Sequence, residues 1–251
     1  MRASVLLESD VRRIWAAVRF VETASARPID AALQVHSDGA RWTRNRSGLH
    51  VLMQLDAPAL RREEFAAHEA AFDPLPDVAA TTLEASVSDP AGRWLPRRFD
   101  IALPRAAVPA GPGAPRLQPL DVSLDPTAAA PLLPTWAVLR ISLRHNGQPA
   151  ANVALRLQRR GGGALLGRGL SDARGEALVI ASGIAQLSIG AGAVVVEREV
   201  AAELVASFDP AAPADVLPNP DTLALRAGVV RKTINCKLAS GRTEALSIDL
   251  P

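Results

Sequence analysis

Two stretches that resemble each other decide the fold: residues 15–21 read WAAVRFV and residues 136–142 read WAVLRIS. They align without gaps, and a proline follows each tryptophan at the same distance, at Pro28 and Pro149. In both stretches apolar side chains alternate with small or polar ones, which is typical of a strand with one buried face. The repetition predicts two copies of one β module.

The likeness continues downstream of both tryptophans. Residues 31–35 (AALQV) correspond to 153–157 (VALRL), and residues 46–51 (RSGLHV) correspond to 173–178 (ARGEAL). Glycine and proline fall between these runs, and Asn146-Gly147 is the strongest turn signal. Short alternating strands separated by turns predict a mainly β protein of the sandwich type.

Length and composition predict two domains. A chain of 251 residues is long enough for two small β domains. The segment 106–116 begins AAVPAGPGAP, contains no periodic run and is predicted to be a linker. We therefore expect a first β-sandwich over residues 1–105 and a second over 117–251. Residues 120–124 (LDVSL) can form an edge strand that starts the second sandwich.

The C-terminal end predicts a hairpin. Apolar side chains alternate in residues 233–238 and again in 245–250, and Ser240-Gly241 lies between the two runs. In this register Cys236 is a core residue and not a nucleophile. Upstream, residues 194–208 are predicted to be a long strand, and the proline-rich residues 209–220 a surface loop.

One segment has a helical pattern. A cap-like Asp56 and an early proline precede good helix formers, which predicts a short helix near residues 58–72. A long inter-strand loop with one helical turn fits the same residues. On the helical interpretation Glu63, Glu64 and Glu69 form the solvent-facing side.

Charge and cysteine content exclude several classes of protein. Lys and Arg number 28 against 26 Asp and Glu, and the arginine doublets at 12–13, 61–62, 97–98 and 159–160 are scattered. We interpret them as solvated strand ends and loops, and expect no nucleic-acid partner. A single cysteine allows neither an intrachain disulfide nor a cysteine-based zinc site.

The chain shows no targeting or spanning segment. Its N-terminal apolar stretch is too short for a signal peptide, and no window approaches 18 consecutive apolar residues. We expect synthesis in the cytoplasm and no membrane insertion.

No motif predicts chemistry. The histidines are His36, His50, His68 and His145, and no G-x-S-x-G elbow accompanies them. We place His36 and His50 in the outward register of their strands, and His145 before a turn.

Neither H-E-x-x-H nor a calcium loop occurs. The glycine-rich residues 161–169 lack the Lys-Ser/Thr ending of a phosphate loop, so they predict a hairpin loop. We predict no catalytic, cofactor-binding or metal-binding residues.

Two segments carry a resemblance to a known family. Residues 147–157 (GQPAANVALRL) and 168–177 (RGLSDARGEA) resemble the carboxypeptidase-regulatory-like, or transthyretin-like, β-sandwich domain, in which a "G-x-P" strand precedes a "T/S-D-x-x-G" turn. The likeness covers residues 136–200 well and 15–55 more loosely. The first copy has Asn-Arg-Ser-Gly at 45–48 and lacks the Ser-Asp pair.

The resemblance implies a scaffold or an adhesive surface. Members without a signal peptide resemble accessory proteins encoded with phage-tail-like contractile injection systems. The expected function is therefore a non-enzymatic structural protein with protein partners, in the cytoplasm or in a released, virion-like particle.

Two alternatives remain open. A small-molecule or carbohydrate-binding module would use Trp42 and Trp94 as exposed stacking platforms, with Trp15 and Trp136 near the two cores. Only 4% of residues are aromatic and none is tyrosine, which argues against sugar binding. An enzyme would need a pocket that gathers His36 or His68 with a carboxylate.

Overall fold

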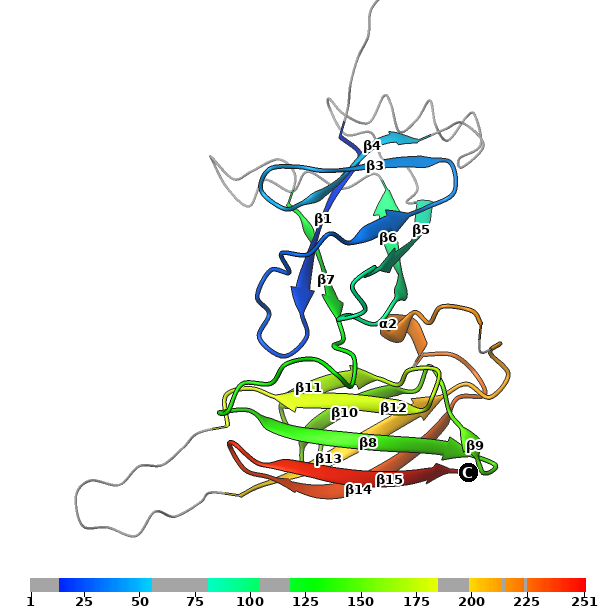
Figure 1. Ribbon diagram of the computed structural model, residues 1–251. Coiled ribbons are helices and arrows are strands. Elements are labelled where there is room, and N and C mark those ends of the chain that lie inside the picture. The colour runs from blue at the N-terminus through cyan, green and yellow to red at the C-terminus, as the bar shows by residue number, and fades with distance from the viewer. Residues whose placement is uncertain (1–13, 56–80, 104–117, 185–198, 214, 224) are drawn as a thin grey trace, which may run out of the picture. The chain divides into compact units, whose positions relative to one another are not determined.

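The computed structural model describes residues 14–55, 81–103, 118–184, 199–213, 215–223 and 225–251 (Figure 1). Within these ranges the chain is mainly β, with one short helix, α2 (Pro220–Leu223). The helix expected near residues 58–72 and the linker expected at 106–116 lie outside the described residues.

The first half of the chain supplies two sheets. One has the strand order β3-β4-β1-β7, and the other has the order β2-β5-β6. The strands are β1 (Ala16–Glu22), β2 (Gln34–His36), β3 (Ala40–Arg44), β4 (His50–Leu55), β5 (Thr81–Ser88), β6 (Arg97–Leu103) and β7 (Leu120–Leu124).

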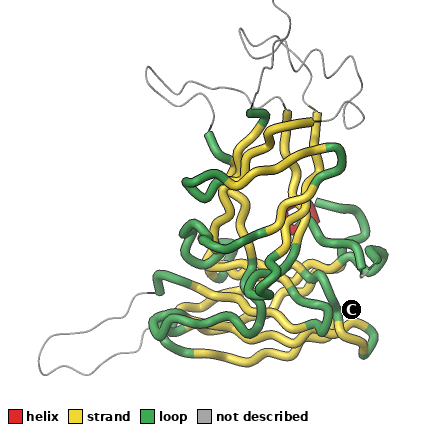
Figure 2. The backbone as a smooth tube through the Cα atoms, turned by 45° about the horizontal axis from the view of Figure 1, so that its top comes forward, coloured by secondary structure: helices red, strands yellow, loops and turns green. Residues whose placement is uncertain are grey.

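The second half supplies two more sheets, whose strands are the yellow tube segments near the C-terminus in Figure 2. One has the order β11-β10-β13-β14, and the other has the order β12-β8-β15, with β9 paired to β8. The strands are β8 (Ala137–His145), β9 (Gln148–Pro149), β10 (Ala154–Arg159), β11 (Leu165–Leu170), β12 (Glu176–Ala181), β13 (Val200–Phe208), β14 (Val230–Leu238) and β15 (Thr243–Leu250).

The two later sheets pack face to face around one core. Leu139 and Ile141 of β8 pack with Leu157 of β10 and Leu204 of β13, and all four side chains are fully buried. The polar residues between them, such as Arg140, stay exposed. The alternation read from the sequence is therefore the alternation of a sandwich-like pair of sheets.

The compact units do not follow the predicted linear division. The smaller unit comprises Met1–Arg19, Val35–Ala85 and Asp100–Asp121, and the larger comprises Phe20–Gln34, Ser86–Phe99 and Val122–Pro251. The chain thus alternates between units, so the expected division into residues 1–105 and 117–251 does not coincide with them.

Strand β7 explains part of this difference. It forms at the expected residues and at a sheet edge, but it pairs with β1 and does not start the second set of sheets. The Arg19 guanidinium donates to both carboxylate oxygens of Asp121, from Nε at 2.7 Å and from Nη2 at 2.9 Å. This long-range pairing carries no local sequence signal.

The predicted C-terminal hairpin is wrong. Strand β14 pairs antiparallel with β13, whereas β15 pairs parallel with β8 in the other sheet. The predicted faces are right, because Leu238, Ile248 and Leu250 are buried in the shared core. A chain that crosses from one sheet to the other shows the same alternation as a hairpin, since both strands direct apolar side chains toward the same interior.

Two predicted turns are confirmed. Asn146 and Gly147 both have positive φ, 52° and 77°, as the tight turn from β8 to β9 requires. In the Ser-Asp-x-x-Gly turn, the Asp172 carboxylate accepts hydrogen bonds from the backbone N–H groups of Arg174 and Glu176. Gly175 has a φ of +74°, and a Cβ there would lie 2.4 Å from the carbonyl oxygen of Leu143. Of the hairpin loop predicted at residues 161–169, residues 161–163 do lie in the loop between β10 and β11, but residues 165–169 belong to strand β11.

Candidate functional site

The outer face of the β11-β10-β13-β14 sheet carries arginines. Arg156 of β10 lies directly opposite Arg168 of β11, and Arg231 of β14 lies opposite Ser207 of β13. Arg156 and Arg168 alternate with buried residues, and Arg231 shares their face because it lies opposite Ser207, so all three point away from the core. Like charges directly opposite on neighbouring strands destabilise a sheet, which makes the Arg156–Arg168 pair unusual.

A cavity of about 520 Å³ lies over this face, and every residue that lines it belongs to the larger unit. Its other wall consists of Thr23, Arg97, Asp125 and Asp221, which follow β1, begin β6, follow β7 and lie in α2. The volume falls within the range of about 300–1,000 Å³ typical of small-molecule sites.

Arg97 anchors the second wall. Its side chain is only 3% exposed, and it donates from Nη1 to the carbonyl oxygen of Ser123 at 2.9 Å and from Nη2 to the Asp221 carboxylate. The guanidinium's planar fork of donors allows this burial, because most of its N–H groups find acceptors. The prediction that the doublet at 97–98 is solvated is therefore wrong for Arg97.

Asp125 is a buried carboxyl in the same wall. It is 5% exposed, and the Thr23 hydroxyl donates to its Oδ1 at 3.0 Å. Burial raises the pKa of Asp125, and the positive charge of Arg97 partly opposes that shift. The neutral form of the Asp125 carboxyl is therefore more favoured in the folded protein than in water, although Arg97 lies nearby.

The cavity has an excess of positive charge. Four arginines line it against two carboxyl groups, so cationic side chains outnumber acidic ones in the lining. The Arg168 guanidinium lies 3.9 Å from the Asp221 carboxylate, which Arg97 also binds. Arg156 makes no ion pair or side-chain hydrogen bond with any residue that the structure describes. A cleft lined by one sign of charge concentrates ions of the opposite sign.

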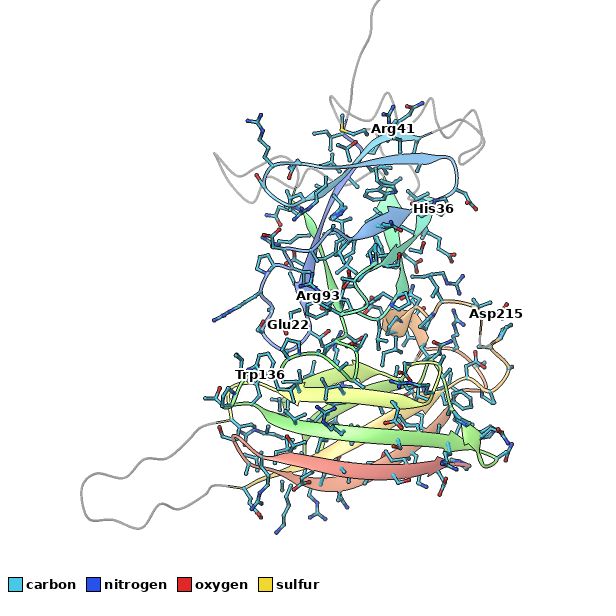
Figure 3. The ribbon with its side chains drawn as sticks, in the orientation of Figure 1. Glu22, His36, Arg41, Arg93, Trp136 and Asp215 are labelled. Atoms are coloured by element: carbon cyan, nitrogen blue, oxygen red, sulfur yellow. The ribbon has the colours of Figure 1, made fainter. Side chains whose placement is uncertain are left out.

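The histidines singled out from the sequence do not lie at this cavity. The ring of His36, labelled in Figure 3, is exposed and lies 3.4 Å from the Asp38 carboxylate. His145 packs its ring against Phe208, with 5.2 Å between ring centroids. His68 lies outside the described residues.

His50 corrects a prediction. We expected it in the outward register, but it is only 5% exposed. His50, Val51 and Leu52 are successive residues of β4 and all three are buried, so both faces of the strand are covered there. A strand covered on both faces hides successive residues, so alternation alone misplaces them.

Cys236 packs against the core and is half-buried. Burial raises the pKa of its thiol to about 11, and the nearby Glu244 carboxylate adds to the shift. The group is therefore a neutral thiol at physiological pH, in keeping with its prediction as a packing residue.

The tryptophans are partly or fully covered. Trp15 is buried, and Trp136, labelled in Figure 3, packs on Val138. Trp42 is half-buried and donates from Nε1 to the Ser37 hydroxyl at 2.9 Å, and Trp94 is also half-buried. Trp42 and Trp94 are therefore not the exposed stacking platforms that the sugar-binding alternative expected.

The described part of the chain contains neither a cluster of metal-ligand side chains nor a membrane-spanning helix. Among residues with a described position, no three His, Cys, Asp or Glu side chains gather as metal ligands would. No helix in the described ranges has the length and apolarity needed to cross a bilayer.

Comparison with known proteins adds little. No family model matches the chain, and no curated protein matches it. Among solved structures the chain is similar to the Bacillus anthracis TIE protein, with a TM-score of 0.25 and 9% identity over 97% of this chain. The chain spans 42% of the length of that protein. A likeness this weak assigns neither a fold family nor a role.

Sequence reasoning missed the residues of the cavity. Alternation with Leu155 and Leu157 places Arg156 on the outer face of its strand, and the same logic applies to Arg168. The facing of these two arginines depends on the β10–β11 register, and Asp125 and Asp221 reach the site only through tertiary packing.

Proposed function

We propose that this chain is a non-enzymatic assembly protein that binds an extended segment of a partner protein along the outer edge of β15. The observation that supports the proposal is the backbone of that strand. Strand β15 pairs with β8 on one side, and no other described strand is hydrogen-bonded to it. Partner proteins commonly bind such edges by adding a strand.

The direction of the free backbone groups follows from one hydrogen bond. The Val138 N–H donates to the carbonyl oxygen of Arg242 at 2.9 Å. In a parallel ladder alternate residues face the same neighbour, so Glu244 and Leu246 also direct their backbone groups to β8. The backbone groups of Ala245 and Ser247 therefore point outward.

The edge is open along only part of its length. Near its end the Lys232 ammonium donates to the carbonyl oxygen of Asp249, which occupies one outward group. Lysine at a strand edge is a common protection against unspecific pairing. The segment from residue 243 to residue 247 is left for a partner.

Half-buried apolar side chains beside the edge of β15 also favour the binding of a partner strand there. Ile234 and Cys236 of β14 and Leu246 of β15 pack on the core but remain half-buried. Strands β14 and β15 are both edge strands and lie next to each other (Figure 1). A docked strand would gain backbone hydrogen bonds and cover these apolar groups.

The finer architecture and the kind of assembly belong to the same proposal. We infer two tandem transthyretin-like modules from the repeat at residues 15–21 and 136–142. We infer a phage-tail-like contractile injection particle as the assembly from the resemblance of residues 147–157 and 168–177 to accessory domains of such systems.

The test compares two substitutions at one outward position. Ser247→Pro removes an N–H that faces away from β8, whereas Ser247→Thr keeps it and suits a strand. In lysates of the organism that makes the protein, we expect wild type and Ser247→Thr to sediment with a large particle and Ser247→Pro to sediment as the free 26.4 kDa chain.

Thermal unfolding of the purified variants serves as the control, because Ser247→Pro must retain the wild-type fold. Wild-type protein that sediments alone would overturn the assembly proposal. A folded Ser247→Pro protein that still sediments with the particle would show that the partner binds elsewhere.

A further inference from the structure

We propose that the arginine-lined cavity binds a small organic anion that carries a phosphate monoester or two carboxylates. This function is distinct from assembly through β15 and uses none of the same residues. It extends the small-molecule alternative by assigning the chemical class of the ligand.

The first argument is the arrangement of Arg156 and Arg168. Their strands place them directly opposite each other, where two cations repel. Arg168 has a carboxylate 3.9 Å away, and Arg156 has none among the described residues. An oxyanion between the two guanidinium groups would remove the repulsion and would match their planar donors.

The second argument is the charge of the whole lining. Arg97 and Arg231 add to this pair, and Asp125 and Asp221 are the only carboxyl groups in the lining, so cationic side chains outnumber acidic ones. A phosphate monoester carries between about −1.5 and −2 charges at neutral pH. An anion of this kind therefore complements the lining better than a cation or a neutral sugar does.

The third argument is the shape and the remaining lining. Hydroxyl groups of Thr23, Ser123 and Ser207 supply neutral hydrogen-bonding partners, and Val205 and Pro220 supply apolar surface. A cavity of about 520 Å³ is much larger than a phosphate ion needs. The ligand thus has an organic body in addition to its charged group.

The buried network gives the cavity a rigid wall. Arg97 is bound by the carbonyl oxygens of Arg98 and Ser123 and by the Asp221 carboxylate. Because these contacts already orient Arg97, this wall loses little side-chain entropy on binding. Arg156 and Arg168, which are exposed, then close on the ligand from the sheet.

The test is isothermal titration calorimetry with inorganic pyrophosphate, glucose 6-phosphate and citrate as probes. The variants are Arg156→Gln and Arg168→Gln, and Arg160→Gln is the matched control, since Arg160 is an exposed arginine of the same hairpin outside the cavity. Loss of one charged hydrogen-bond donor should weaken binding about tenfold or more.

We expect at least one probe to bind wild type and Arg160→Gln equally, and to bind Arg156→Gln and Arg168→Gln about tenfold or more weakly. Preference for the phosphates over citrate identifies a phosphate ligand, and the reverse identifies a polycarboxylate. The Ser247→Pro variant should bind as wild type does.

Two results would overturn the proposal. One is the absence of binding of all three probes to wild type at concentrations of about 10 mM, which corresponds to a free energy too small for a specific site. The other is equal weakening by Arg160→Gln, which would show attraction to the general surface charge. Neither result bears on assembly through β15.

Discussion

The backbone N–H of Val138 donates to the carbonyl oxygen of Arg242 at 2.9 Å. This contact starts the parallel ladder between β8 and β15. Strand β15 is the last strand of its sheet. The pairing with β8 separates β15 from β14, its neighbour along the chain, and leaves an outward edge. In a local hairpin this edge of β15 would instead be hydrogen-bonded to β14.

Gly175 should tolerate no side chain. Gly175→Ala places a Cβ 2.4 Å from the carbonyl oxygen of Leu143 at a φ of +74°, whereas Gly162→Ala has the same φ with open space around it. We expect Gly162→Ala to cost about 1 kcal/mol of unfolding free energy and Gly175→Ala more than about 2 kcal/mol. Chemical denaturation measures both, and equal costs would contradict the close approach.

Leu204 should be a major contributor to the core. It is fully buried on β13, so Leu204→Ala leaves a cavity and should lower the free energy of unfolding by about 2–5 kcal/mol. Leu225→Ala is the control, because that side chain is 85% exposed and its removal should change stability by less than about 0.5 kcal/mol. Urea denaturation of both variants checks the prediction, and similar losses would show that the core is misplaced.

Asp125 should make stability depend on pH. Its pKa is raised in the fold by burial, so its stabilising contribution is fully present below the unfolded pKa of about 3.9 and is lost as pH rises through the folded pKa. Asp125→Asn does not titrate, and Asn can still accept from Thr23. We expect wild type to lose unfolding free energy relative to Asp125→Asn as the pH rises from about 4 to about 7.

The measurement is the difference in unfolding free energy between the two proteins at each pH. Any constant cost of the amide cancels in this comparison, because only the change with pH is used. A difference that is independent of pH, or that changes in the opposite direction, would contradict the raised pKa of Asp125.

Cys236 should react slowly in the folded protein. With a thiol pKa of about 11, its thiolate fraction near pH 8 is roughly a hundredfold or more below that of an ordinary cysteine with a pKa of about 8.5. Iodoacetamide alkylation followed by mass spectrometry should therefore be slow at pH 8 and should accelerate toward pH 11. Alkylation in denaturant is the control and should proceed at the ordinary rate, and rapid alkylation of the folded protein would refute the shift.

Local signals predicted the strands and most of their faces. Val18 and Phe20 in the first copy and Leu139 and Ile141 in the second are buried, as their alternation required. The turns at Asn146-Gly147 and at Gly175 are also where the sequence placed them, because each needs a residue that accepts a positive φ. These features depend on a few neighbouring residues, so they can be read one segment at a time.

Pairing of strands was less predictable. Strand β7 paired with β1, and β15 paired with β8, against the expectations of a second module starting at residue 117 and of a C-terminal hairpin. His50 and Arg97 were misplaced for a related reason, since their burial depends on what covers their strands. The candidate cavity was missed altogether because its lining residues come from segments distant in the sequence.

The sequence by itself determined that this is a mainly β protein, where its turns fall and which side chains face the core in most strands. It could do so because a strand buries every second side chain whatever its partner is. Only the tertiary structure decided that Arg156 faces Arg168 and that Arg97 is buried beside Asp221. Those neighbours depend on register and on long-range packing, and the two-residue period of a strand is the same for every partner it can pair with.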